Sequence, residues 1–61
     1  PSLTELDLSN NFDLKNISIS LFDSLPNLKK LNIRLTAIPY EDIRQLEIYL
    51  EENNRDIRFI Y

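Results

Sequence analysis

The 61-residue chain contains no cysteine, no histidine and no glycine. Without cysteine it has no disulfide framework and no cysteine-based zinc site, and without histidine it lacks the commonest metal ligand and general base. Without glycine no glycine-rich loop can cradle a phosphate, which excludes the P-loop and dinucleotide-binding fingerprints. We therefore expect no metal, no cofactor and no catalytic residues.

The lack of glycine also constrains the turns. A left-handed backbone conformation must then be adopted by other residue types, of which asparagine tolerates it best. The sequence offers Asn10, Asn11, Asn53 and Asn54 for this purpose. We expect the tight turns to lie at these two Asn-Asn pairs.

Long apolar runs and an excess of positive charge are missing as well. No apolar segment approaches the roughly 18 residues needed to cross a bilayer, and no leader resembles a signal peptide. The net charge is −3, with −3 in residues 1–27 and zero in residues 28–61. Nucleic-acid binding requires a clustered basic surface. We therefore expect neither a membrane nor a nucleic acid as partner.

An internal repeat is the main feature that is present. The pattern L-x-x-L-x-L-x-x-N opens the chain and returns 25 positions later with apolar residues at each apolar site, as Leu3, Leu6, Leu8, Asn11 and then Leu28, Leu31, Ile33, Thr36. A fixed period in the twenties indicates a repeat architecture. Thr36 replaces the second asparagine, and a hydroxyl donates one hydrogen bond where an amide donates two, so the second turn should be held more weakly.

This pattern resembles the leucine-rich repeat family. The resemblance implies an α/β leucine-rich repeat solenoid fragment, with a short parallel sheet on the concave side and helical arcs on the convex side. One domain fragment would then consist of a repeat over 3–27, a repeat over 28–53 and a final strand at about 56–61. The start on Pro1 without an initiator Met favours a piece of a longer protein.

Two helices are expected between the strands. Ile43, Leu46 and Leu50 recur at helical spacing among charged residues. The acidic pair Glu41-Asp42 suits the first turn of this helix, and Asn53-Asn54 should end it. A shorter helix is expected over residues 20–25, with Ser20 and Asp23 spaced like the members of a capping box.

The final strand is aligned with the second one by pairing Ile57 with Leu31 and Phe59 with Ile33. This alignment predicts three lateral rows on the concave side, namely Glu5, Lys30, Asp56; Asp7, Asn32, Arg58; and Ser9, Arg34, Ile60. The first row alternates in charge. It is either an ion ladder that fixes the strand register or a set of ligand contacts, and the sequence leaves both possibilities open.

The resemblance implies a protein-protein interaction module that binds a protein partner through this concave sheet. The candidate partner-binding residues are Arg34, Arg58, Asn32, Asp7, Lys30 and Tyr61. Arginine and tyrosine are enriched among interface anchors, although Tyr61 is also simply the last residue. The acidic pairs on the second helix point about 100° apart and do not converge on one substrate atom, so they do not indicate an enzyme.

Alternative interpretations remain. The chain could be a structural or capping segment of a larger leucine-rich repeat protein whose recognition surface lies elsewhere. Self-association through the exposed repeat ends is also expected, because Leu3, Leu6 and Leu8 have no neighbouring strand on one side. Secreted members of the family commonly carry cysteine-rich caps, so the lack of cysteine favours an intracellular source. Asn16-Ile17-Ser18 matches a glycosylation acceptor, with chance as the favoured explanation.

Overall fold

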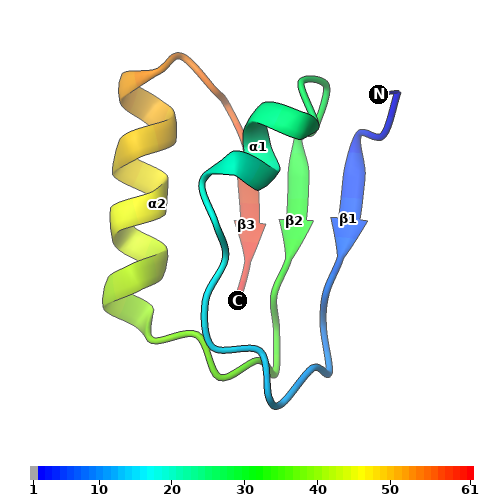
Figure 1. Cartoon of the computed structure of the whole chain (residues 1–61), viewed down its shortest axis with the longest axis vertical. Helices are drawn as coiled ribbons and strands as arrows, with labels where there is room; N and C mark the ends of the chain where they lie inside the picture. The colour runs from blue at the N-terminus through cyan, green and yellow to red at the C-terminus, as the bar shows by residue number, and fades with distance from the viewer. Residues whose placement is uncertain (1) are drawn as a thin grey trace.

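The computed structural model describes residues 2–61, so Pro1 lies outside the described residues. Within residues 2–61, three strands form one parallel sheet in the order β1 (Glu5–Asp7), β2 (Lys30–Asn32) and β3 (Arg58–Ile60). Figure 1 shows the strands side by side, with one helix in front of the sheet and the other beyond β3. The expected α/β class with a parallel sheet is confirmed.

The helices are α1 (Ser20–Ser24), between β1 and β2, and α2 (Tyr40–Glu52), between β2 and β3. The second helix follows the predicted pattern, because Ile43, Leu46 and Leu50 are all buried. Its N-cap is Pro39 and its first turn is acidic, which suits the positive end of the helix dipole.

The core lies between the sheet and the helices. The buried apolar residues described between positions 2 and 61 are Phe22, Leu28, Leu31, Ile33, Ile38, Ile43, Leu46 and Leu50. Leu31 is 0% exposed and forms the centre of the middle strand. Phe22 is 1% exposed, and its ring centroid lies 6.3 Å from that of Phe59. Its neighbours Leu21 and Leu25 are only half-buried. Phe22 is the residue that closes the core beneath the sheet.

The start of α1 differs from the expected capping box. Ile19 occupies the N-cap position in a helical conformation. The Ser20 hydroxyl lies 2.8 Å from the Ser18 hydroxyl, and the Ser18 hydroxyl accepts a hydrogen bond from the Ser20 N–H at 3.2 Å. A serine turn that begins two residues earlier, at Ser18, therefore takes the place of the Ser20 and Asp23 box.

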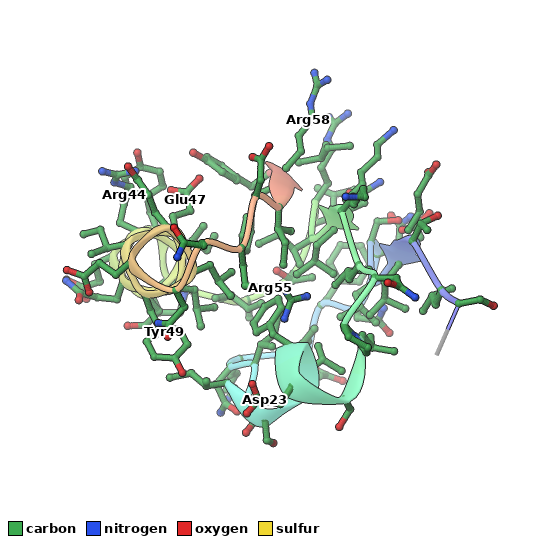
Figure 2. The ribbon with its side chains drawn as sticks, turned by 90° about the horizontal axis from the view of Figure 1, so that it is seen from above. Asp23, Arg44, Glu47, Tyr49, Arg55 and Arg58 are labelled. Carbon is green, nitrogen blue, oxygen red and sulfur yellow. The ribbon has the colours of Figure 1, made fainter. Side chains whose placement is uncertain are left out.

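Arg55 holds the other end of α1. Its guanidinium donates from Nη1 to the Phe22 carbonyl and from Nη2 to the Leu25 carbonyl, each at 2.8 Å. Figure 2 shows Arg55 reaching from the segment before β3 toward α1. The last carbonyls of a helix lack the usual helical donors. Here each accepts one backbone N–H, from Leu25 and Leu28, and Arg55 supplies each with a second, charged donor. The clamp joins parts of the chain that are 30 or more residues apart.

The turns after β1 and β2 share a backbone conformation. Asn10 has φ 63° and Leu35, 25 positions later, has φ 58°. A third left-handed residue, Asn54 with φ 58°, follows α2. The expectation for Asn10 and Asn54 is confirmed, whereas Leu35 is a left-handed position at which no asparagine stands.

The predicted difference in side-chain hydrogen bonds between the two turns is confirmed. The Asn11 amide donates to the Leu8 carbonyl at 2.7 Å and to the Ser9 carbonyl at 3.2 Å. The Thr36 hydroxyl donates to one carbonyl, that of Ile33, at 2.9 Å.

The register of β3 corrects the predicted alignment by two residues. Leu31 pairs with Phe59, and Lys30 and Asn32 pair with Arg58 and Ile60. The lateral rows are therefore Glu5, Lys30, Arg58 and Asp7, Asn32, Ile60. Because side chains alternate with a period of two, the shift keeps the apolar side of β3 toward the core. Asp56 lies outside the rows.

Candidate interaction face of the sheet

One face of the sheet points away from α1 and from the core. The side chains that strand alternation places there, here called the open face, are Glu5, Asp7, Lys30, Asn32, Arg58 and Ile60. Figure 2 shows Arg58 standing away from the sheet on the side opposite Asp23 and α1. A hollow of about 210 Å³ lies on this face, lined by five of these residues and by Leu6. The open face is thus a shallow surface with a polar border.

The charges on the open face follow the observed register. Lys30 Nζ lies 3.9 Å from Glu5 Oε1, with both side chains well exposed. Such a pair contributes about 0–1 kcal/mol to folding. On its other side Lys30 neighbours Arg58, not the acidic Asp56 that the sequence alignment placed there. The row therefore reads acid, base, base, and two like charges stand side by side at the β3 edge.

Asp7 and Asn32 have matching roles within the chain. Asp7 Oδ1 accepts hydrogen bonds from the Ser9 N–H at 2.9 Å and from the Ser9 hydroxyl at 2.5 Å. The Ser9 hydroxyl is the main cause, and the Ser9 N–H the second, of a pKa of Asp7 below its ordinary value. Asn32 Oδ1 accepts a hydrogen bond from the Arg34 N–H at 3.1 Å. Both candidate residues hold the turn that follows their strand.

Arg34 and Tyr61 lie outside the six-residue face. Arg34 is exposed in the turn after β2, where its carbonyl accepts a hydrogen bond from the Asn10 N–H at 3.0 Å. Tyr61 directly follows β3 and is 53% exposed. Its ring centroid lies 5.7 Å from that of Tyr40 at the start of α2. Loss of solvent there raises the pKa of Tyr61, and the Glu47 carboxylate adds to the effect.

A groove runs between α2 and the free edge of β3. Its volume is about 550 Å³, and its apolar lining comes from Leu50, Ile57 and Phe59. On its rim, Arg44 Nη1 lies 2.9 Å from Glu47 Oε1, and the Glu47 hydrogen bond raises the pKa of Arg44. Figure 2 shows Arg44 and Glu47 on the same side of the molecule as Arg58. The sequence pattern missed this groove, because its walls come from a helix and a strand whose relative placement depends on tertiary packing.

Within residues 2–61, no group of three or more His, Cys, Asp or Glu side chains is arranged to hold a metal ion. None of the helices described in that range is long and apolar enough to cross a membrane.

Comparison of the chain with protein-family models, with curated proteins and with solved structures finds no match. The open face and the groove between α2 and β3, here called the edge groove, are both hollowed surfaces.

Proposed function

We propose that the chain is built from leucine-rich repeat units. The support is the recurrence of one local structure at the sequence period. The strand residues Leu6 and Leu31, which are 25 positions apart, are direct partners in the sheet. Each is followed at the same distances by a side-chain acceptor for the turn and by a left-handed residue. A solenoid is made by stacking units of this kind.

We infer that the open face serves as a protein-protein interaction surface that binds a protein partner. The observation that carries this proposal is the adjacent pair Lys30 and Arg58 beside the half-buried Ile60, on the sheet face away from α1. Adjacent like charges on a sheet disfavour each other until an anion lies between them. Arginine next to apolar surface is the usual composition of an interface anchor. The surface therefore suits a partner segment that carries acidic and apolar side chains.

The proposal contains no catalytic step and no cofactor. The two carboxylates of the open face already have partners within the chain, since Glu5 lies near Lys30 and Asp7 accepts a hydrogen bond from Ser9. Neither is placed as a free acid or base facing the hollow. The role we propose is binding alone.

A displayed peptide library of random sequence provides the test. The library is selected on the immobilised chain, and the affinities of the enriched peptides are measured by interferometry. We expect enriched peptides to be acidic, and to bind the Lys30→Glu, Arg58→Glu double variant at least about tenfold more weakly. The matched control is Lys15→Glu, an exposed residue between β1 and α1. It should leave the affinity unchanged, while circular dichroism melts verify that each variant is folded.

The alternative, a structural or capping segment, makes the opposite prediction. Enriched peptides would then bind the double variant and the control equally well. Equal weakening by Lys15→Glu would assign the effect to net charge and would also contradict an open-face site.

A further inference from the structure

Among residues 2–61, the two edge strands of the sheet are less well covered than the middle unit. In the middle unit Leu28 is 2% exposed and Leu31 is 0% exposed. The matching Leu3 at the β1 end is 41% exposed, and Leu6 is half-buried. At the β3 end Phe59 is half-buried and lines the edge groove. In the apolar row Leu6, Leu31, Phe59, only the central residue Leu31 is therefore fully buried.

The backbone of both edges is suited to a further parallel strand. Toward β2, strand β1 uses the Thr4 carbonyl and the Leu8 N–H. Because a parallel ladder uses alternate residues on each side, the N–H and C=O groups of Glu5 and Asp7 point to the outer edge.

At the opposite edge, the Arg58 N–H donates to the Lys29 carbonyl and the Ile60 carbonyl accepts from the Ile33 N–H. The backbone groups of Phe59 consequently point outward. This outer edge of β3 has the same alternation as the β2 edge that binds β3.

The side chains of the two edges are complementary in charge. If β1 of a second copy continues the sheet beyond β3 with the same pairing rule, its Glu5 stands beside Arg58, its Leu6 beside Phe59 and its Asp7 beside Ile60. The row then reads acid, base, base, acid, with strands about 4.8 Å apart. Each of the like-charged neighbours then has a carboxylate partner. Lys30 has Glu5 of its own chain at 3.9 Å, and Arg58 gains Glu5 of the second copy.

The edge groove provides room for the apolar side chains of the added strand. It lies between α2 and β3, and its apolar lining contains Leu50, Ile57 and Phe59. Leu6 of a second copy would enter it as Leu31 packs next to Phe59 within the chain. Burial of the exposed Leu3, just before β1, and of the half-buried Leu6 supplies the apolar part of the interaction.

We propose that the chain self-associates head to tail, with β1 of one copy adding as a parallel strand to the β3 edge of the next. The contact joins two different surfaces, so it does not close on itself and allows growth into longer assemblies. Opposite charges at the two edges select this arrangement over pairing of like edges.

Charge exchange tests the proposal by sedimentation velocity over a wide concentration range. The original chain is expected to grow in mass with concentration. Arg58→Glu and Glu5→Lys should each remain monomeric, because each places like charges at the contact. An equal mixture of the two variants restores complementary charges at every contact, so it should associate again, at least about tenfold more strongly than either variant alone.

Two outcomes would overturn the proposal. A monomeric original chain at all concentrations excludes self-association. Undiminished association of one single variant indicates pairing of like edges.

A second measurement does not depend on charge. The sequence has no cysteine, so introduced thiols are unique. Asp7→Cys and Ile60→Cys chains are mixed under oxidising conditions, since adjacent strands bring Cα atoms within disulfide range. A mixed disulfide that forms faster than either self-disulfide supports the register, whereas equal rates contradict it.

The two proposals fail separately. If the chain is monomeric but the open-face variant loses peptide binding, the proposed interaction surface is supported and only the head-to-tail contact is rejected.

Discussion

The turns that follow β1 and β2 have one shape and different residues. After β1, Asp7 binds the N–H two residues on, Asn10 is left-handed, and the Asn11 amide donates to two carbonyls. After β2, the three equivalent positions are held by Asn32, Leu35 and Thr36, and the last of these donates to one carbonyl. The first turn is therefore well matched to its local sequence, and the second is formed against the preference of Leu35.

The segments after the two turns show the reverse. The first leads to the five-residue α1, whose end depends on Arg55 from a distant segment. The second leads to the 13-residue α2, which buries three apolar residues of its own. The two units are therefore stabilised at different places. The first depends on its turn and on a long-range clamp. The second depends on core packing, which compensates for an unfavourable turn.

Truncation of the core leucine in each unit should give the largest difference. Leu31→Ala removes a fully buried side chain and should destabilise the fold by about 2–5 kcal/mol, which can equal the whole stability of so small a chain. Leu6→Ala, at the equivalent position of the first unit, removes a half-buried side chain and should cost clearly less. Urea unfolding followed by circular dichroism measures both. Equal losses would contradict the view that the second unit carries the core.

Removal of the long-range clamp tests the first unit. Arg55→Ala removes two charged hydrogen bonds, although the Phe22 and Leu25 carbonyls each keep one backbone N–H donor. It should cost about 2 kcal/mol, because hydrogen bonds from charged groups contribute about 1.5–3 kcal/mol. Arg55→Lys should restore only part of this, since an ammonium cannot reach both carbonyls in a fork. The control is Arg44→Ala, which breaks an exposed ion pair and should cost less than about 1 kcal/mol. Equal changes in Tm for the two alanine variants would contradict a stabilising role for the Arg55 clamp.

Exchange of the left-handed residues sharpens the turn comparison. Leu35→Asn relieves an unfavourable backbone conformation and should stabilise the chain by about 1 kcal/mol. Loss of the leucine side chain matters little because it is 57% exposed. The reverse change, Asn10→Leu, should destabilise by a similar amount. Chemical denaturation of the two variants measures both, and a destabilised Leu35→Asn chain would show that the side chain has a packing role.

The smallest expected effect is a difference between the two turns in how stability depends on pH. Asp7 has a lowered pKa in the folded chain, so its contribution is complete above the ordinary value of 3.8 and is lost as the pH falls through the folded pKa. Asp7→Asn makes the first turn resemble the second, which has an uncharged acceptor. We expect the Tm of the original chain to fall relative to that of the variant on acidification. Parallel Tm curves across the acid range would contradict this.

Local patterns were sufficient for much of the fold. The recurrence of Leu6 and Leu31 located two strands in their observed register, and the spacing of Ile43, Leu46 and Leu50 located α2. These features depend on the alternation of a strand and the period of a helix, and both patterns can be read from a short stretch of sequence. The candidate face could be predicted only in part. Strand alternation places Lys30 and Asn32 on this face, but it does not determine which β3 residues lie beside them.

By itself the sequence determined the parallel α/β arrangement, the two helices and the left-handed turns at Asn10 and Asn54. Only the tertiary structure decided that Arg58 stands beside Lys30, that Phe22 closes the core, and that Arg55 completes α1. Each of these depends on the path of the chain over 28 or more residues or on the fit of side chains from several elements. A shift by two residues keeps every β3 side chain on its own face, so hydrophobic pattern alone cannot distinguish the two registers. The packing of α2 and of the segment before β3 makes that choice, and with it sets the charges of the open face.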